Sequence, residues 1–421
     1  MRTSMSSRSV WLLASLAWMS LSPSGVLAQA GSTTLVSVTP AGVPGNGDSR
    51  GPSISARGRF VAFWSGASDL VPNDTNSYPD VFVRDRVAGV TTRVNVSSTG
   101  DQSNGWVGSH GLSEDGRFVV FSSTASDLVP GDSNGTEDVF VHDRDTGMTT
   151  RVSVASDGTQ GLGKSYAAVV TANGRFVAFA STAILAPDDT SPMVSVYVHD
   201  RRTHHTQLAS INPSGTPFGS TGSCASLAFG PTLSANGRFV AFEGYAGSPL
   251  FCAYAYVRDL ATQTTEVVGA TGNDVDNESG NPVISPDGSR VVYLNDSLQL
   301  VMRELDTGTE TPVCVSDTGI LGSSVFQAAI SSDNRFVALT SPSPLVADDT
   351  NGVFDSYVRD VLSGQTIRVS VSSAGLQSGK KSIPGPAISR DGRFVAFSSL
   401  GQFVSGDTNN KGDIFVHELR H

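Results

Sequence analysis

Short apolar runs recur along the chain, each directly after a polar turn. The clearest belong to a ten-residue block that occurs seven times: ISARGRFVAF from Ile54, LSEDGRFVVF from Leu112, VTANGRFVAF from Val170, LSANGRFVAF from Leu233, ISPDGSRVVY from Ile284, ISSDNRFVAL from Ile330 and ISRDGRFVAF from Ile388. Asp-Gly or Asn-Gly at the centre favours a two-residue hairpin turn, because these residues tolerate positive φ angles. The unbroken apolar run that follows indicates a strand covered on both faces. Each block therefore predicts a strand end, a tight turn and a buried second strand.

Two further strands are expected after each block. The third strands read VFVRD from Val81, VFVHD from Val139, VYVHD from Val196, AYVRD from Ala255, LVMRE from Leu300, SYVRD from Ser356 and IFVHE from Ile414. The fourth are more polar, with the threonine and valine alternation of an outer strand, as in TTRVNV from Thr91 and TIRVSV from Thr366. The seventh repeat ends before a fourth strand, whereas TTLVSV from Thr33 has the missing pattern and precedes the first block.

Blocks that start 46 to 63 residues apart point to a propeller or an array. The sequence therefore predicts an all-β fold, a seven-bladed β-propeller of four-stranded antiparallel blades. The N-terminal strand completes the last blade and so leaves no open sheet edge. We expect residues 31–421 to form this single domain, with repeats anchored near residues 54, 112, 170, 233, 284, 330 and 388.

The first thirty residues have the pattern of an export signal. Arg2 and Arg8 precede the apolar run 10–19, and Ala28-Gln-Ala30 is a small-x-small cleavage signal. We expect residues 1–30 to be a cleaved signal peptide and the protein to be extracytoplasmic, either periplasmic or secreted. Loss of the two arginines takes the net charge from −11 to −13. An acidic chain without a basic patch argues against nucleic-acid binding. No later apolar stretch is long enough for membrane insertion.

The fifth block contains Ser285-Pro286-Asp287-Gly288, the signature of the TolB-type, WD-repeat-like propeller repeat. The other six blocks keep the turn and the apolar strand but lack the proline. The chain thus resembles this family over residues 33–418. The resemblance implies a propeller fold, and propellers of this kind serve as binding platforms, enzyme-associated domains and periplasmic scaffolds. TolB propellers have six blades and an additional N-terminal domain, so their own role is not carried over.

Four loops between the second and third strands carry oxygen side chains at alternate positions and then another carboxylate. Such a set suits a hard cation such as Ca²⁺, and the pattern is similar to the calcium loops of integrin-type propellers, although a third acidic position is missing. The alternative is a network of Asx turns that orders each loop. The candidate metal ligands are Asp74, Asn76, Asp80, Asp132, Asn134, Asp138, Asp349, Asn351, Asp355, Asp407, Asn409 and Asp413.

Other motifs are interpreted as structural. The segment 158–165 fits the P-loop pattern but joins an outer strand to the next inner strand, so no cofactor-binding residue is assigned. The charged pair that ends every third strand, such as Arg84-Asp85, is expected to order the adjoining turn. Cys224 and Cys252 could pair in an oxidising compartment, and Cys314 is expected to be buried. No nucleophile elbow or zinc spacing is present, so no catalytic residue is assigned.

The sequence therefore favours a non-catalytic binding or scaffold propeller. Its protein or glycan partner is expected on the face that carries the loops between the second and third strands, because long loops on a rigid scaffold usually carry binding. One alternative is a propeller lyase or hydrolase that acts on a polysaccharide, which would need clustered histidine, arginine and carboxylate groups at the channel mouth. Another is a structural component of a cell-surface assembly.

Overall fold

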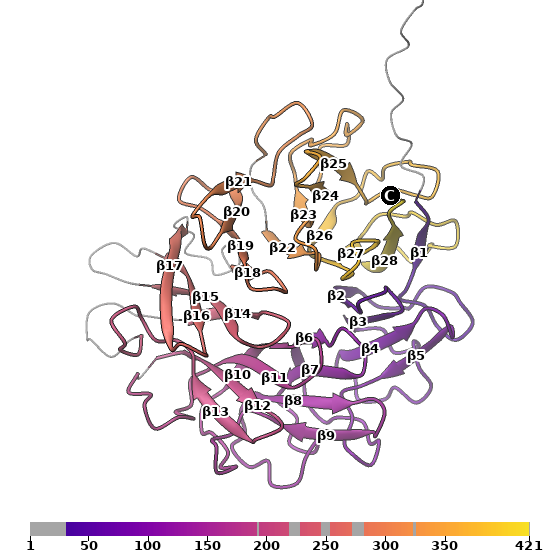
Figure 1. Ribbon diagram of the computed structural model, residues 1–421. Coiled ribbons are helices and arrows are strands. Elements are labelled where there is room, and N and C mark those ends of the chain that lie inside the picture. Colours follow the sequence, from indigo (N-terminus) through magenta and orange to yellow (C-terminus); the bar gives the residue numbers. More distant parts are fainter. Residues whose placement is uncertain are drawn as a thin grey trace, which may run out of the picture.

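The computed structural model describes residues 31–191, 193–218, 228–245, 253–271, 282–322 and 326–420. In these residues, seven antiparallel sheets of four strands each form the blades of a ring (Figure 1). The first strand of each blade lies nearest the axis and the fourth lies outermost. The predicted seven-bladed propeller is confirmed. Residues 1–30, Cys224 and Cys252 lie outside the described residues.

Blades 1 to 3 follow one another along the first half of the ring. Their strands are β2 (Ser49–Ile54), β3 (Phe60–Ser65), β4 (Asp80–Asp85) and β5 (Val90–Arg93); β6 (Val107–Leu112), β7 (Phe118–Ser123), β8 (Asp138–Asp143) and β9 (Met148–Arg151); and β10 (Ser165–Val170), β11 (Phe176–Ser181), β12 (Ser195–Asp200) and β13 (His205–Leu208).

Blades 4 to 7 complete the ring, and the seventh takes its outer strand from the N-terminal segment. Their strands are β14 (Ala228–Leu233), β15 (Phe239–Tyr245), β16 (Ala253–Asp259) and β17 (Thr264–Thr271); β18 (Val283–Ile284), β19 (Arg290–Leu294), β20 (Leu300–Glu304) and β21 (Glu310–Pro312); β22 (Phe326–Ile330), β23 (Phe336–Ser341), β24 (Asp355–Asp360) and β25 (Gln365–Arg368); and β26 (Ser382–Ile388), β27 (Phe394–Ser399), β28 (Asp413–Glu418) and β1 (Thr33–Leu35).

The hairpin between the first two strands of a blade has the turn geometry expected from its sequence. Gly116 has a φ of 75°, and Asn334, which replaces glycine in the sixth repeat, has a φ of 59°. A Cβ atom built on Gly116 would lie 2.2 Å from the ring of Phe60 in the preceding blade. Glycine is therefore needed here both for the backbone angle and for the close approach of two blades.

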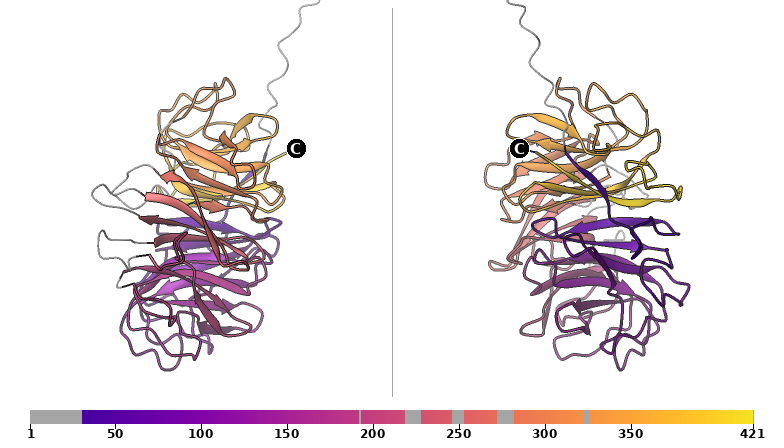
Figure 2. Two further views of the ribbon diagram at one scale, coloured as in Figure 1. Left: turned by 60° about the vertical axis from the view of Figure 1, so that its left-hand side comes forward. Right: turned by 90° about the vertical axis from the view of Figure 1, so that its right-hand side faces the viewer.

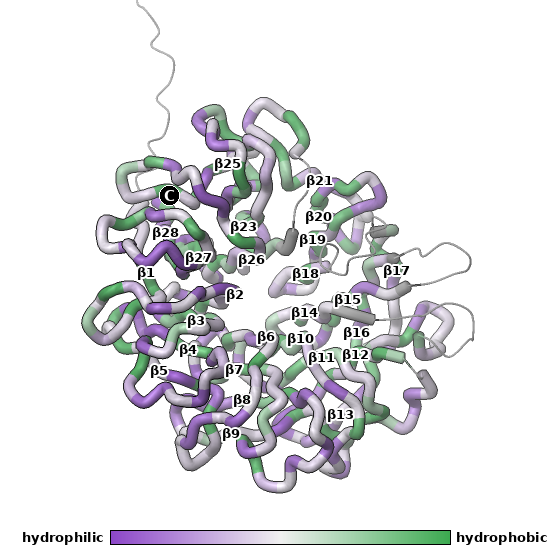
Figure 3. The backbone as a smooth tube through the Cα atoms, turned by 180° about the vertical axis from the view of Figure 1, so that it is seen from behind, coloured by the Kyte–Doolittle hydropathy of each residue, from purple (hydrophilic) through white to green (hydrophobic). Residues whose placement is uncertain are grey.

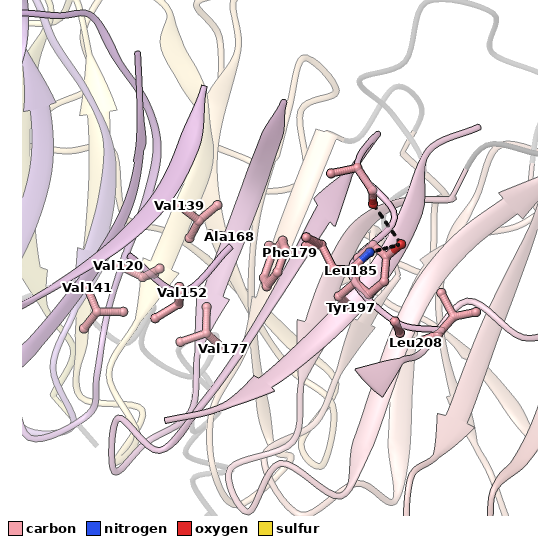
Figure 4. Packing of buried hydrophobic residues seen from close by; sticks show 12 residues of the cluster. Val120, Val139, Val141, Val152, Ala168, Val177, Phe179, Leu185, Tyr197 and Leu208 are labelled. Atoms are coloured by element: carbon pink, nitrogen blue, oxygen red, sulfur yellow. Dashed lines mark hydrogen bonds between the residues drawn. The ribbon is translucent and has the colours of Figure 1, made fainter. Parts of the chain in front are cut away.

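The hydrophobic core lies between the blades. One cluster joins Val120, Val139 and Val152 of blade 2 to Phe179 and Tyr197 of blade 3 (Figure 4). All five side chains are at most 2% exposed, so the middle strands are covered on both faces. The hydroxyl of Tyr197 donates to the carbonyl of Ala183 at 2.9 Å, which satisfies the polar end of the ring inside the cluster.

The ring closes by non-covalent strand pairing. Strand β1 pairs antiparallel with β28, so that Thr33 faces His417 and Leu35 faces Phe415. Edge-on views show the indigo N-terminal strand alongside the yellow C-terminal one (Figure 2). The N–H of Val36 also donates to the carbonyl of Ile414 at 2.8 Å. The predicted completion of the last blade by an N-terminal strand is confirmed.

An arginine one or two residues after each tight turn binds the acid at the end of the third strand. Arg117 forms a bidentate pair with Asp143, with distances of 2.7 and 2.6 Å. Asp143 also accepts the N–H of Asp145 at 3.1 Å, as expected for a turn-ordering acid. The Arg117 guanidinium lowers the pKa of Asp143 to about 2. The recurring acid is therefore structural, and its main partner is the arginine of the ten-residue block.

No helix in the described ranges has the length and apolar character needed to cross a membrane.

Candidate functional site

The loops between the second and third strands meet the connections between blades at one face of the ring. The side-chain amide of Gln102, on the connection from blade 1 to blade 2, donates to Asp74 Oδ1 at 2.8 Å. Gln160 donates to Asp132 in the same way, also at 2.8 Å. Two long variable segments of each repeat therefore lie together, as expected from the order of the strands.

The acidic residues of three loops surround an arginine of the fourth strand. Arg93 Nη1 lies 3.3 Å from Asp74 and 3.2 Å from Asp80. Arg151 Nη1 lies 3.3 Å from Asp132 and 3.7 Å from Asp138. In blade 6, Arg368 Nη1 lies 3.3 Å from Asp349. The structure thus brings these predicted ligands together, but around a guanidinium group.

The loop asparagines form the Asx turns that were the alternative interpretation. The side-chain oxygens of Asn76, Asn134 and Asn351 accept the N–H groups of Tyr78, Thr136 and Val353 at 3.0, 3.0 and 3.1 Å. Their side-chain NH₂ groups reach the second acid, as in the 2.7 Å bond from Asn351 to Asp355. These bonds order the loops through side chains of the chain itself.

The fourth predicted loop, in blade 7, lies beside the N-terminal segment. Asp413 starts β28 and accepts the hydroxyl of Ser37 at 2.5 Å. The side-chain nitrogen of Asn409 donates to the carbonyl of Gly45 at 2.9 Å. Burial raises the pKa of Asp407 and raises that of Asp413 to about 6. These residues therefore lie at the junction of the two ends of the propeller.

A second group of polar residues occupies the axial ends of blades 1 to 3 and departs from the repeat. We define the inner cluster as Arg50, His110, Glu137, Lys164 and Tyr166. Arg50, His110 and Tyr166 lie on the successive inner strands β2, β6 and β10, which lie along one side of the ring's centre in Figure 3. Glu137 directly precedes β8, and Lys164 directly precedes β10.

Glu137 links blade 2 to blade 3. Its main-chain carbonyl accepts the N–H of Ser165 at 2.7 Å. A Cβ atom built on Gly108 would lie 2.6 Å from Ser122 Oγ and 2.7 Å from Glu137 Oε1, so a glycine is needed beside this carboxyl. Burial raises the pKa of Glu137, against the opposing effects of a hydrogen bond with Ser122 and the charge of Lys164. Such a carboxyl can donate as well as accept a proton.

The remaining members supply positive charge and aromatic surface. Lys164 Nζ lies 5.3 Å from the centre of the Tyr166 ring, and the Arg50 guanidinium lies 4.2 Å from that of Trp64. Lys164 and Arg50 are exposed, and Tyr166 is half-buried. Blade 1 and blade 3 therefore each place a cation beside an aromatic ring.

His110 lies where the inner strand of blade 2 is irregular. The pairing of β6 with β7 shifts between Val107 and His110. The first two strands of five other blades show the same shift, so it belongs to the repeat. A Cβ atom built on Gly51 would lie 3.2 Å from the His110 ring. Burial lowers the pKa of His110 to about 4, so the imidazole is neutral at pH 7. Its Nε2 is buried, and backbone groups of Gly51 and Gly108 lie beside the imidazole and partly offset the effect of burial on its pKa.

The inner cluster was not identified from the sequence, because no motif contains it. The signal is a departure from the repeat. In four blades the third strand begins with an aspartate. The residue directly before this aspartate is Glu137 in blade 2, but Pro79, Phe354 and Gly412 in blades 1, 6 and 7. The P-loop-like segment 158–165 runs between blades and leads into strand β10, not into a helix. Cys314 is a buried free thiol whose pKa burial raises to about 11.

Comparisons with solved structures place the chain among propellers that include enzymes. An oligogalacturonate lyase in complex with manganese has a TM-score of 0.57 and 13% identity, over 93% of this chain and 96% of that one. An oligogalacturonate lyase from Vibrio parahaemolyticus has a TM-score of 0.54 and 12% identity, over 93% and 97%. A prolyl endopeptidase has a TM-score of 0.53 and 12% identity, over 89% of this chain and 50% of that one. No protein-family model and no curated protein matches the chain.

These comparisons correct the functional interpretation of the sequence. The prediction of a non-catalytic binding or scaffold propeller is wrong, and so is the prediction that the protein is not an enzyme, because enzymes share this fold over nearly the whole chain. The enzymatic alternative is better supported. The resemblance to the TolB-type repeat is confirmed as far as the propeller fold that the seven blades show.

Proposed function

We propose that the protein is an enzyme that cleaves an acidic polysaccharide by lyase chemistry at the inner cluster. The observation that carries this proposal is Glu137, a partly buried carboxyl with a raised pKa in a position that is apolar or glycine in three other blades. The oligogalacturonate lyases, which share the fold, support the choice of substrate class. We also propose that the chain is exported after cleavage near residue 30.

In this proposal the cluster residues have separate roles. Arg50 and Lys164 bind the carboxylate of a uronate unit, which favours loss of the proton on the adjacent carbon. A water molecule accepts that proton, because His110 Nε2 is buried and does not reach the substrate. Glu137 donates a proton to the leaving glycosidic oxygen as the carbon–oxygen bond breaks and a carbon–carbon double bond forms. No three His, Cys, Asp or Glu side chains converge in the described parts of the chain, so we derive no manganese-dependent step.

The test is an assay of purified residues 31–421 with polygalacturonate and a neutral glucan. A lyase produces unsaturated ends, which absorb ultraviolet light, whereas a hydrolase produces reducing ends without that absorbance. Glu137→Gln is expected to lower kcat by roughly 10²-fold or more. Glu266→Gln makes the same chemical change at an exposed position on β17 and is expected to have no effect. Failure to cleave any acidic polysaccharide would contradict the proposal.

A further inference from the structure

Three of the four Asp-Asn-Asp loops contain their own cation. In blades 1, 2 and 6 a fourth-strand arginine lies within 3.3 Å of the first acid. Arg93 and Arg151 have side chains that are 11% exposed, and that of Arg368 is 1% exposed. The loops of blades 1 and 2 add the glutamines that bind Asp74 and Asp132. Each acidic pair therefore has one positive charge of the chain beside it, which compensates one of its two negative charges.

Blade 7 lacks every one of these partners. Leu35 has the register of Arg93, because it faces Phe415 on β28 as Arg93 faces Phe82 on β4. Pro44 bridges Val38 where, in blade 1, Gln102 bridges Val96. Tyr357 donates its hydroxyl to Asp349 in blade 6, but the equivalent residue in blade 7 is Phe415. Relative to blades 1 and 2, which also have phenylalanine at the position of Phe415, the changes at Leu35 and Pro44 remove the positive charge and the amide donor.

The two acids of blade 7 are nevertheless retained and buried. Asp407 is 5% exposed and Asp413 is 0% exposed. Asp407 Oδ1 and Asp413 Oδ2 have no hydrogen-bond partner within the described residues. The other oxygen of Asp413 accepts the Ser37 hydroxyl, and Asp407 accepts the N–H of Asn409. One oxygen of each carboxylate therefore remains buried without a donor, and buried charges are normally paired or bound to a metal.

Blade 3 shows that loss of the arginine alone does not leave such a site. Leu208 occupies the arginine position there as well, because it faces Tyr197. The second acid is replaced by Ser195, which pairs with Ser181 at the start of β12, and the remaining acid, Asp189, accepts the hydroxyl of Tyr197. Blade 7, in contrast, keeps two acids and has no internal cation.

We propose that the blade 7 loop binds one divalent cation, Ca²⁺, through Asp407, Asp413 and the side-chain oxygen of Asn409. Two carboxylates and an amide oxygen are ligands that Ca²⁺ prefers, and backbone carbonyls and water commonly complete its shell. The Asn409 oxygen accepts the N–H of Lys411 at 2.9 Å and retains a second lone pair. The cation takes the place that an arginine guanidinium has in the equivalent loops of blades 1, 2 and 6.

The site also joins the two ends of the propeller. Ser37 donates to Asp413 and lies just after β1, while Gly45 accepts from Asn409. A cation held by the C-terminal loop therefore stabilises the segment that closes the ring, and it stabilises only the closed form. This inference does not depend on the proposed catalytic activity.

The experiment is calorimetric titration of metal-stripped residues 31–421 with CaCl₂, together with thermal unfolding with and without Ca²⁺. One Ca²⁺ per chain and a higher Tm in Ca²⁺ are expected. Asp413→Asn should abolish both effects, whereas Asp138→Asn, the same change at the equivalent position of blade 2, should leave both in place. Leu35→Arg should replace the cation, so that this variant unfolds at a Tm that does not depend on Ca²⁺.

Several results would overturn the inference. The first is the absence of binding at millimolar Ca²⁺, and the second is a stoichiometry of several ions per chain. Ca²⁺ binding that survives in Leu35→Arg would also overturn it. This variant keeps Asp407, Asn409 and Asp413, so it still tests the inference if Asp413→Asn fails to fold. A titration with MgCl₂ distinguishes the larger cation from the smaller one, and preference for Mg²⁺ would contradict the assignment to Ca²⁺.

Discussion

Single positions within the repeat carry most of the chemical differences between blades. Arg93, Arg151 and Arg368 hold their acidic loops closed, whereas Leu35 at the same register leaves two acids without a cation. Glu137 likewise stands where other blades have apolar residues or glycine. Because all blades share the same backbone structure, the residue at the equivalent position of another blade serves as a control for each substitution.

Removal of the arginine from blade 2 should be costly. Arg151→Leu leaves Asp132 and Asp138 buried without their cation, and breaking a buried ion pair from one side costs about 3 kcal/mol. Urea unfolding of the two proteins measures this loss of stability. Arg202→Leu, at an exposed position, is expected to stay within roughly 0.5 kcal/mol of the wild type. Equal effects of the two substitutions would contradict the structural role of Arg151.

Two glycines with the same backbone angle should differ in their response to alanine. Gly116 and Gly147 have φ values of 75° and 72°, so each alanine costs about 1 kcal/mol in strain. At Gly116 the added Cβ also meets the Phe60 ring, whereas at Gly147 nothing lies within 4 Å. Gly116→Ala should therefore lose about 1–3 kcal/mol more than Gly147→Ala in urea unfolding. Equal losses would show that the blades can separate to accommodate the methyl group.

Among the elements, strand β1 is the one whose removal should open the ring. Its residues pair with β28, and Val36 packs in the core cluster shared by blades 7 and 1. Deletion of residues 31–38 leaves β28 as an exposed edge, which favours aggregation. We expect a markedly lower Tm and concentration-dependent aggregation by light scattering. A synthetic peptide of residues 31–45, added in trans, should restore the Tm, and a scrambled peptide is the control.

For the molecule as a whole, acidification should reduce stability through buried histidines. Burial lowers the pKa of His110, His199 and His417 to about 4, from an ordinary value of 6.5. The unfolded chain therefore binds more protons between these values, and stability is lost as the pH falls from 6.5 toward 4. Asp413, with its raised pKa, acts in the opposite direction over part of this range. We expect the Tm to decrease between pH 6.5 and 4.

Comparison of single variants isolates the histidine contribution. His417→Gln should make the dependence of Tm on pH shallower, because the buried His417, which bonds Thr33 at 2.8 Å, no longer titrates. His205 is exposed, and His205→Gln should retain the slope of the wild type. The same slope in both variants would rule out His417 as a source of the pH dependence.

The fold could be predicted from the sequence because each repeat contains its own strands and turn signals. The Asp-Gly and Asn-Gly turns, the apolar second strands and the pattern at Thr33 together require a closed ring. The inner cluster could not be predicted in this way, because Glu137 meets Lys164 and Tyr166 only after two blades have packed together. The contact of Arg93 with Asp74 and Asp80 likewise depends on strand register.

The pairing of β1 with β28 also sets the order in which the protein can mature during synthesis. Thr33 and His417, which meet in this pair, are separated by 384 residues. A ribosome therefore makes the partner of β1 only after blades 1 to 6, and the first strand stays unpaired while those blades form. Loop closure over such a span is slow compared with hairpin formation within a blade. Completion of the ring is consequently the final event of folding, and a nascent chain released early exposes an unpaired edge to other chains.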